Sequence, residues 1–416
     1  MTKRYPDAAG GDAYVVRGLE REQVAAGHQV QVVTSRNTSI CDARNVLKVG
    51  LPVTDEQIDS VNLRRILSMA ALAARAFPML RAIRPDIIHA HTTDLGWCLS
   101  LAARWYRIPC VITLHGTTIG RAASPRFRRL AESALLRGGH YERVLTLDPS
   151  TMPALRRLGV GDRLDYVPNG IDSTDFDSTD FAPAPGAFDD EPGPGDGDAA
   201  TAPTVLFVGR LESVKGVGFL LTAFAAVLRG EPTARLLIVG SGSMRPELER
   251  TAGALGIGRS VSFAGARPRA ELPGLYRQAA VFVLPSLYEG FPLVLLEAWA
   301  HGTPVVITRV GAVPHVCRPG VDAMIVRPGD ADGLAGAIVE VLRDAVLAAR
   351  LREGGMRRVE LGEFTPAAVA GRVQGIYHEV IASGGDGRPR RRRRPLKAAR
   401  RGRYAGLSDP SARTTP

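Results

Sequence analysis

The stretch at 286–306, "SLYEGFPLVLLEAWAHGTPVV", carries the pattern that decides the fold. An apolar run at 280–286, "AVFVLPS", reads as a buried strand, and the apolar segment after the glycine-proline turn reads as a helix capped at Gly302. Glu289 lies in the turn, and Glu297 is predicted about two turns along the helix. Strand, loop and helix in this order are typical of a parallel α/β sheet, where ligands bind at the carboxyl ends of the strands.

The same alternation extends over most of the chain. Short apolar runs are separated by stretches with helical periodicity, which predicts parallel sheets with crossover helices. The predicted strands are 29–34, 86–90, 110–115, 143–147, 204–209, 235–240, 260–265, 280–286, 304–308 and 323–326. They form two groups, so we expect two doubly wound, Rossmann-like domains that face each other across a cleft.

Composition marks where these domains begin and end. Residues 173–203 contain eight acidic residues and no Lys or Arg, with many Pro and Gly, and this is typical of a flexible linker. The predicted organisation is an N-terminal Rossmann-like domain at 1–172, the linker at 173–203, a second Rossmann-like domain at 204–365, a helix at 366–382, and a basic, disordered tail at 383–416.

The net charge of +11 comes from that tail. Residues 388–403 hold ten Arg or Lys and no acidic residue, and the rest of the chain has 43 basic against 42 acidic residues. A neutral body offers no second basic surface, so nucleic acid is not an expected partner. An anionic membrane surface is the expected partner of the tail.

The sequence argues against several other classes of protein. No run approaches the roughly 18 apolar residues of a membrane span. The first residues, "MTKRYPDAAGG", have no apolar segment typical of a secretory signal. The four cysteines form no CxxC pair, which favours reduced thiols in a cytoplasmic protein.

The two glutamates alone are weak signals. A surface loop acid at Glu289 and an exposed helix position at Glu297 would give the same pattern. A loop that opens a helix, however, offers backbone N–H groups and the positive end of the helix dipole, and carboxylates accept hydrogen bonds from sugar diols.

Several segments together resemble one family. "PSLYEGFPLVLLEAWAHGTPVVITRVGAVPHV" is similar to the E-x7-E segment of retaining glycosyltransferases of the GT-B fold, often called family 4, and "VGRLESVKGVGFLLTAF" at 208–224 is similar to their phosphate-binding segment. "HAHTTDLGWCLSLAARWYRIPCVITLHGT", "VPNGID" and "YPDAAGG" match in family order. The resemblance covers residues 1–382 without the linker. It implies that 1–172 is the acceptor-side domain, that 204–365 binds the nucleotide sugar, and that the helix at 366–382 crosses back to the first domain.

The resemblance implies a nucleotide-diphosphate sugar as donor, a hydroxyl acceptor and hexosyl transfer with retention. The implied catalytic residues are Glu289, His115, Arg210 and Lys215, and the implied donor-binding residues are Gly11, Gly209, Gly290, Phe291, Leu293, Val294 and Glu297. In the family the first glutamate lies against the donor sugar and the second against the ribose. The matching histidine reaches the donor sugar from across the cleft.

Elementary chemistry agrees for the two cations. A diphosphate leaving group gains negative charge as the glycosidic bond breaks, and the guanidinium of Arg210 and the ammonium of Lys215 would stabilise it most in the transition state. No Asp-x-Asp pair stands at a matching strand end, so no metal and no other cofactor is expected. His89 and His91 lack a third ligand, which favours a structural role.

Two departures from the family stand out. Ala13 occupies a position where the family often has Glu or Gln, which leaves the acceptor open. Met1 directly precedes "TKRYP", where the family has already run through a buried strand, so the first strand of the N-terminal domain is expected to be missing.

A GT-B-fold sugar-nucleotide epimerase and an inactive sugar-nucleotide-binding relative remain as alternatives to the transferase. The "GRLESVKG" segment favours the transferase over the epimerase. For a transferase of this family the expected context is glycan biosynthesis for the cell envelope. We expect the protein in the cytoplasm, with peripheral attachment at the inner face of the membrane through the tail.

Overall fold

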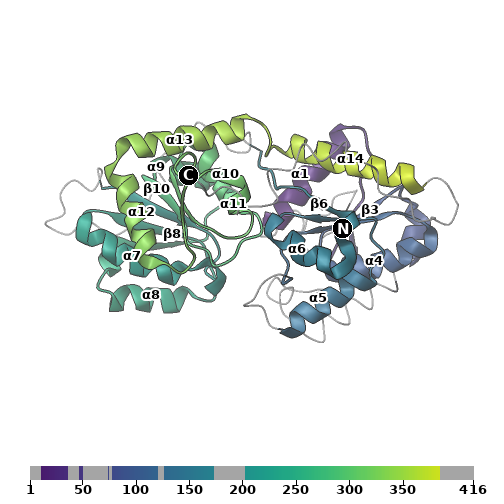
Figure 1. Ribbon diagram of the computed structural model, residues 1–416, viewed down its shortest axis with the longest axis horizontal. Coiled ribbons are helices and arrows are strands. Elements are labelled where there is room, and N and C mark those ends of the chain that lie inside the picture. The colour runs from purple at the N-terminus through teal and green to yellow at the C-terminus, as the bar shows by residue number, and fades with distance from the viewer. Residues whose placement is uncertain are drawn as a thin grey trace, which may run out of the picture. The chain divides into compact units, whose positions relative to one another are not determined.

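The computed structural model describes residues 11–35, 46–49, 74, 77–119, 126–172 and 202–384. The chain divides into two units. Unit 1 comprises Met1–Pro168 together with Val369–Pro416, and unit 2 comprises Asn169–Ala368. Both are α/β units with parallel sheets, as the sequence predicts, and Figure 1 shows the helices of each unit around its strands.

Unit 1 contains two parallel sheets in its described part. One pairs β1 with β2, and the other has the strand order β3-β4-β5-β6. The strands are β1 (Val32–Ser35), β2 (Val46–Val49), β3 (Ile88–Ala90), β4 (Cys110–Leu114), β5 (Arg143–Thr146) and β6 (Leu164–Tyr166). The helices are α1 (Gly11–Ala25), α4 (Thr93–Tyr106), α5 (Arg126–Gly138), α6 (Met152–Leu155) and most of α14 (Pro366–Gly384).

Each predicted strand of unit 1 is present, and two more were not predicted. β2, "VLKV", and β6, "LDY", have only four and three residues, and each contains a charged one, so they do not stand out from loops. The predicted absence of a first strand concerns residues before Gly11, and these lie outside the described residues. The same is true of 173–201 in the predicted linker and of 385–416 in the predicted tail.

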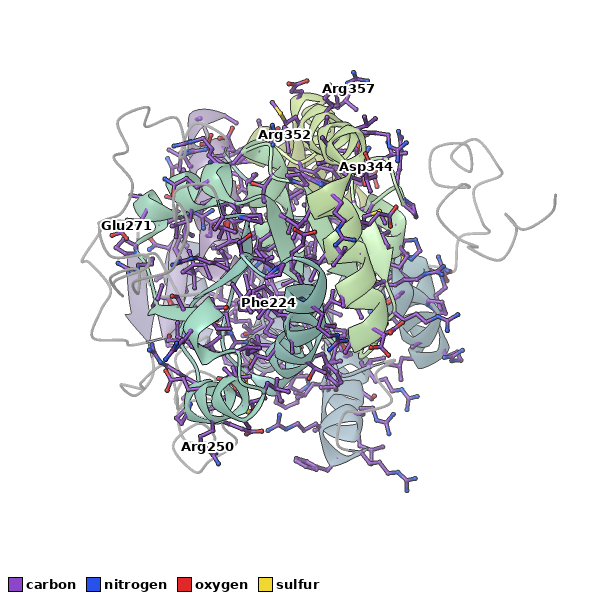
Figure 2. The ribbon with its side chains drawn as sticks, turned by 90° about the vertical axis from the view of Figure 1, so that its left-hand side faces the viewer. Phe224, Arg250, Glu271, Asp344, Arg352 and Arg357 are labelled. Atoms are coloured by element: carbon purple, nitrogen blue, oxygen red, sulfur yellow. The ribbon has the colours of Figure 1, made fainter. Side chains whose placement is uncertain are left out.

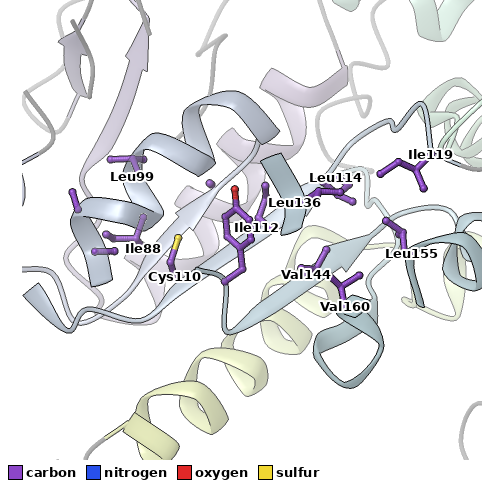
Figure 3. Close-up of a cluster of buried hydrophobic side chains, with 14 of the residues drawn as sticks. Ile88, Leu99, Cys110, Ile112, Leu114, Ile119, Leu136, Val144, Leu155 and Val160 are labelled. Carbon is purple, nitrogen blue, oxygen red and sulfur yellow. The ribbon is translucent and has the colours of Figure 1, made fainter. Parts of the chain in front are cut away.

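The core of unit 1 fills the space between one face of its four-stranded sheet and the helices. Ile88, Ile112 and Val144 extend from three neighbouring strands, and Leu99 and Leu136 meet them from α4 and α5 (Figure 3). The five residues of β4 are all buried, because helices cover both faces of a parallel sheet.

The other face of that sheet is covered by the last helix. Val369, Val373 and Val380 of α14 pack in one cluster with Leu19 of α1 and Val111 of β4. The i, i+4 spacing of the first two places them on one side of the helix. The chain therefore returns to unit 1 after building unit 2, and α14 lies beside α1 (Figure 1).

Unit 2 has one six-stranded parallel sheet with the order β12-β11-β10-β7-β8-β9. Its strands are β7 (Thr204–Val208), β8 (Arg235–Val239), β9 (Val261–Gly265), β10 (Val281–Leu284), β11 (Val305–Thr308) and β12 (Met324–Val326). Its helices are α7 (Val217–Gly230), α8 (Arg245–Ala254), α9 (Leu272–Gln278), α10 (Leu293–Ala300), α11 (Val313–Val316), α12 (Ala331–Arg343) and α13 (Ala345–Glu360). All six predicted strands of this half are present.

Apolar and charged side chains separate as expected for such a fold. Phe224 of α7 is fully buried and lies in the interior of unit 2, whereas Arg250, Arg352 and Arg357 project at its periphery (Figure 2). α7 packs beside α12, and α10 packs beside α13. In the part of the chain that the structure describes, no helix is both long and apolar enough to cross a membrane.

Candidate active site

The strand order of unit 2 reverses next to β7. From β7 the chain proceeds to β8 and β9 on one side, and then returns to place β10, β11 and β12 on the other side. β7 and β10 are therefore the neighbours at which the strand order reverses, and in sheets of this kind ligands bind at the carboxyl ends of such strands. The predicted site residues of unit 2 follow these two strands.

Lys215 and Glu289 meet at this point. Lys215 ends a short 3-10 turn, Ser213–Lys215, in the loop after β7, and its Nζ lies 2.6 Å from Oε1 of Glu289 in the loop after β10. The same carboxylate oxygen accepts a hydrogen bond of 2.6 Å from Oγ of Ser286. The side chains of Lys215 and Glu289 are only 17% and 10% exposed. The pair is therefore held in place before any ligand binds.

The backbone joins the two loops directly. The N–H of Leu287 donates to the carbonyl of Val214 over 2.8 Å. Gly216 has φ +67°, and a Cβ there would overlap the carbonyl oxygen of Pro285. Only glycine fits both the left-handed conformation and this close approach, so the glycine of the "KG" pair allows Lys215 to reach Glu289.

A second contact fixes the far side of the loop that carries Glu289. A Cβ on Gly311, which has φ +55°, would overlap the carbonyl oxygen of Glu289, and the N–H of Ala312 donates to the carbonyl of Gly290 over 3.0 Å. The segment that follows β11 therefore packs closely against the backbone of the loop that carries Glu289, and this contact restricts the conformation of the loop.

Asn169 anchors the end of this loop. Its Nδ2 donates to the carbonyl of Phe291 over 3.3 Å, and the residue is only 4% exposed. The neighbouring Ile171 donates its N–H to the carbonyl of Phe364, whose ring lies 5.7 Å from that of Phe291. The sequence showed "VPNGID" only as a family match, and it did not single out Asn169 as a support of the loop.

The donor-binding residues predicted at the start of α10 can act through their backbones. Phe291 and Leu293 are 6% and 8% exposed, so their side chains belong to the core. Pro292 is the N-cap of α10. The first N–H groups of a helix have no intrahelical acceptor and lie at the positive end of its dipole. The N–H groups of Leu293 and Val294 therefore suit an anionic or hydroxyl oxygen.

Glu297 is the fifth residue of α10, just over one turn from its start rather than the two turns expected. Its side chain is only 4% exposed. Oε1 accepts a hydrogen bond of 2.8 Å from Arg269, and Oε2 accepts one of 3.0 Å from the hydroxyl of Tyr276. Burial and the neighbouring carboxylate raise the pKa of Tyr276, which keeps its hydroxyl protonated as the donor.

The position of Glu297 bears on its predicted contact with ribose. Each carboxylate oxygen has a second acceptor position, so contact with a ribose hydroxyl is compatible with the two bonds it already accepts. That role stays a prediction. The sequence analysis missed Arg269, which begins the short 3-10 turn Arg269–Glu271 and belongs to no recognised motif.

Gly209 and Arg210 directly follow β7. The N–H of Gly209 donates to the carbonyl of Val239 at the end of β8 over 2.9 Å, and the side chain of Arg210 is exposed. Arg210 thus shares the loop of Lys215. In unit 1, Gly11 is the exposed first residue of α1, and Ala13 is buried.

His115 follows β4 in unit 1 and is half-buried. Its Nε2 lies 2.9 Å from Nδ1 of His91, which follows the neighbouring strand β3. The ring of His91 lies against that of His89, with centroids 4.2 Å apart and the planes tilted by 32°, and His89 hydrogen-bonds to Thr113 and Tyr377. Burial lowers the pKa of His89 and of His91 well below 6.5, so both rings are neutral.

These contacts give His89 and His91 partners within the protein. No group of three or more His, Cys, Asp or Glu in the described ranges has an arrangement that could hold a metal ion.

Comparison with known families gives two matches along the chain. Residues 202–344 match the model described as "Glycosyl transferases group 1", and residues 10–170 match the model described as "Glycosyl transferase 4-like domain". Together they span both units, with the Lys215–Glu289 pair in the first region and His115 in the second.

Two relatives show how far the similarity extends. "Uncharacterized glycosyltransferase MJ1607" of Methanocaldococcus jannaschii is 30% identical over 370 residues, covering 83% of this chain and 88% of the relative. "D-inositol 3-phosphate glycosyltransferase" of Frankia alni is 31% identical over 414 residues, covering 90% and 96%.

Solved structures share the fold. Sucrose-phosphate synthase from Thermosynechococcus elongatus is similar with a TM-score of 0.76 and 26% identity, covering 92% of this chain and 98% of that chain. Anabaena Alr3699/HepE, solved in complex with UDP-glucose, has a TM-score of 0.70 and 18% identity, covering 91% and 98%.

Proposed function

The chain belongs to the group 1 glycosyltransferases, of the family 4 type with the GT-B fold, and from this premise we propose that it transfers a hexose from a nucleoside diphosphate to a hydroxyl acceptor with retention of anomeric configuration. The observation that carries the proposal is the Lys215–Glu289 pair at the switch point of unit 2. The alternatives, an epimerase and an inactive binder, lack an observation of their own.

The reaction breaks the bond between the anomeric carbon and the diphosphate oxygen, and the bonding electrons leave with the diphosphate. Lys215 has three N–H donors, of which Glu289 uses one, so two remain for phosphate oxygens. Together with the guanidinium of Arg210, it would stabilise the charge that develops on the leaving group. These two cations do the work that a metal does elsewhere, so we propose that no metal is required.

The acceptor hydroxyl attacks the anomeric carbon, and its proton passes to the departing phosphate. Glu289 is proposed to accept hydrogen bonds from hydroxyls of the donor sugar, through the carboxylate that Lys215 and Ser286 hold in place. Backbone N–H groups at the start of α10 would bind sugar or phosphate oxygens. His115 is proposed to hydrogen-bond the donor sugar.

We propose a UDP-hexose as the first donor to test, because the similar HepE structure holds UDP-glucose. The relatives differ in the acceptors that their names indicate, so only the chemical class of acceptor, a hydroxyl compound, is proposed here. The basic segment at 388–403 is proposed to attract an anionic membrane surface, at roughly 1 kcal/mol per charge near the surface.

The decisive test is mass spectrometry of nucleotide release from a panel of UDP-, GDP- and ADP-sugars, with glycan, lipid-linked and small-molecule hydroxyl acceptors. We expect acceptor-dependent release of one nucleoside diphosphate. The anomeric coupling constant of the product, measured by NMR, should match that of the donor. Nucleotide binding without release from any donor would favour an inactive binder, and an altered sugar still attached to the nucleotide would favour an epimerase.

Liposome sedimentation tests the membrane proposal separately. The full chain should sediment with anionic vesicles at low salt, and a variant lacking residues 383–416 should not. Equal sedimentation of both forms would rule out the tail as the anchor.

A further inference from the structure

Three histidines lie together where β3 and β4 of unit 1 end. His89 is in β3, His91 is the first residue after it, and His115 is the first residue after β4. In the parallel pairing of these strands His89 is opposite Val111. His89 and His91 each contact a β4-side residue two positions further along the chain than the one opposite them. His89 thus reaches Thr113, and His91 reaches His115.

The two contacts have different surroundings. His89 is held from both sides, since its Nε2 lies 2.7 Å from the hydroxyl of Thr113 and its Nδ1 lies 2.6 Å from the hydroxyl of Tyr377. His91 is 7% exposed and is wedged between the other two rings, with centroids 4.2 Å from His89 and 5.2 Å from His115. The ring of His91 therefore has little freedom to turn.

The contact between His91 and His115 constrains where the protons lie. A hydrogen bond between Nδ1 of His91 and Nε2 of His115 needs one proton, so one ring must donate and the other must accept. When both rings are neutral, the tautomer of His91 fixes the tautomer of His115. The tautomer of His115 in turn decides whether its Nδ1 carries a proton, because Nε2 is engaged with His91.

We propose that His91 is a positioning residue for His115. Through the contact between its Nδ1 and Nε2 of His115, His91 fixes the orientation of the His115 ring and decides which nitrogen of that ring carries the proton toward a sugar hydroxyl. The role of His115 toward the sugar rests on the proposed function. The His91–His115 coupling itself does not. Nothing in the sequence pattern indicated it, because the two residues are 24 positions apart and meet only through the strand register.

The coupling can be read by NMR without any assay of activity. In the full chain with 15N-labelled histidine, long-range 1H–15N spectra report the tautomer of each ring, and a His115→Gln sample assigns His115. We expect one tautomer of His115 in the unsubstituted protein near pH 8. Nitrogen shifts averaged between two tautomers would overturn the proposal without any variant of His91.

Two substitutions of His91 separate the hydrogen bond from packing. His91→Phe keeps an aromatic ring, slightly larger than imidazole, against His89, but it removes Nδ1. His91→Asn places an amide close to the position of Nδ1. The expected result for His91→Phe is a mixture of His115 tautomers and about a tenfold fall in kcat with little change in the KM for the donor, as for the loss of one orienting contact. His91→Asn should recover kcat to within about threefold.

Tyr377→Phe is the matched control. It removes the hydroxyl that contacts His89 and leaves the His91–His115 contact intact. This variant should keep the His115 tautomer and change kcat by less than about twofold. Circular dichroism and thermal melting of each variant establish that unit 1 is folded.

The outcomes distinguish the inference from the proposed function. An unchanged tautomer of His115 in folded His91→Phe would overturn the inference. A changed tautomer with unchanged kcat would support the coupling, and it would remove His115 from the proposed reaction. Equal loss of kcat in His91→Phe and Tyr377→Phe would overturn the positioning role, because it would show that general disturbance of the site is responsible.

Discussion

The candidate site residues of the two units are held in different ways. In unit 2 they form charged pairs, Lys215 with Glu289 and Arg269 with Glu297. In unit 1 the neighbouring rings of His89 and His91 are neutral, and they are held by hydroxyl groups and by another imidazole. Burying a charged pair costs desolvation free energy. In return, the pair keeps a cation in a fixed position for anionic ligand groups and a carboxylate in a fixed position for hydrogen-bond donors.

The difference fits a division of labour. A diphosphate needs fixed cations, and Lys215 and Arg210 of unit 2 are the residues proposed to supply them at the switch point of its sheet. A neutral imidazole can donate one hydrogen bond and accept another, so it can orient a hydroxyl without adding charge. The comparison therefore predicts that removal of a charged side chain lowers turnover most in unit 2, and that acidification lowers the free energy of unfolding most in unit 1.

The largest effect is expected for Glu289→Gln. The substitution keeps the shape of the side chain and removes the charge beside Lys215, so turnover should fall by about 10²-fold or more while the fold is retained. Steady-state kinetics and thermal melting measure the two properties. Glu249→Gln is the control, since it removes a carboxylate from an exposed i, i+4 pair of the same unit and should leave turnover unchanged. Near-normal turnover of Glu289→Gln would end its assignment as a catalytic residue.

The next largest effect is expected for the two cations. Lys215→Ala and Arg210→Ala should each lower kcat by roughly 10- to 100-fold, because each removes charge stabilisation from the leaving diphosphate. Addition of EDTA should leave the activity of the unsubstituted enzyme unchanged. If EDTA abolishes activity and Mg²⁺ or Mn²⁺ restores it, the argument that cationic side chains replace a metal is wrong.

A smaller effect is expected for Glu297→Ala. It should weaken nucleotide binding by about tenfold through the loss of its predicted hydrogen bonds to ribose. It also removes the acceptor of the buried Tyr276 hydroxyl and one charged bond of Arg269, at a cost of about 2 kcal/mol, since the Arg269 side chain is 37% exposed and solvent compensates in part. Calorimetry of UDP binding checks the first effect, and denaturant unfolding checks the second. Unchanged affinity for UDP in the folded variant would confine Glu297 to a structural role.

The fold was predictable because its signal repeats. A strand such as β7, "TVLFV", is apolar throughout, and the ten predicted strands follow one another with helices between them. The Lys215–Glu289 contact was not visible in the sequence, although both residues were. The two are 74 positions apart, and their meeting depends on the strand order and on Gly216.

The supporting residues of the site were harder to predict. Asn169, Ser286 and Arg269 are single polar residues without periodicity. Asn169 and Arg269 each hydrogen-bond a residue far away in the sequence, and Ser286 bonds Glu289 within one loop. His91 was visible only as one of two histidines, for which a structural role was the simplest interpretation. Pairwise contacts of this kind depend on strand register, and a hydrophobic pattern specifies the face of a strand but not the distant residue it will meet.

The response of unit 1 to acid follows from its buried histidines. Because burial lowers the pKa of His89 and His91 well below 6.5, the folded unit stays neutral while the unfolded chain binds protons as the pH falls through 6.5. The free energy of unfolding therefore decreases on acidification. Between about pH 7.5 and 5.5 the opening equilibrium of unit 1 should rise by about tenfold for each histidine.

Hydrogen exchange of β4 peptides, corrected for the intrinsic pH dependence, measures this opening. His28→Gln, which replaces an exposed histidine of the same unit, should leave the response unchanged. Constant protection of β4 over this pH range would contradict the assignment of neutral, buried histidines.

The smallest expected effect is that of acid on unit 2, where the free energy of unfolding should increase rather than decrease. Asp322 is fully buried, and burial raises the pKa of its carboxyl from 3.8 to about 6 despite the N–H of Arg318, which donates to Oδ1 over 2.7 Å. The folded unit therefore binds a proton as the pH falls through 6, where the unfolded chain does not, and its free energy of unfolding increases. Between about pH 7.5 and 5.5 the opening equilibrium of unit 2 should fall by about fourfold.

Hydrogen exchange of β11 and β12 peptides measures the opening of unit 2. Asp322→Asn keeps an acceptor for Arg318 but cannot titrate, so in this variant the opening equilibrium should not depend on pH. The same acidification should raise the opening equilibrium of unit 1 and lower that of unit 2, so one exchange experiment on the full chain tests both predictions. If both equilibria change in the same direction, the charge assigned to the buried histidines or to Asp322 is wrong.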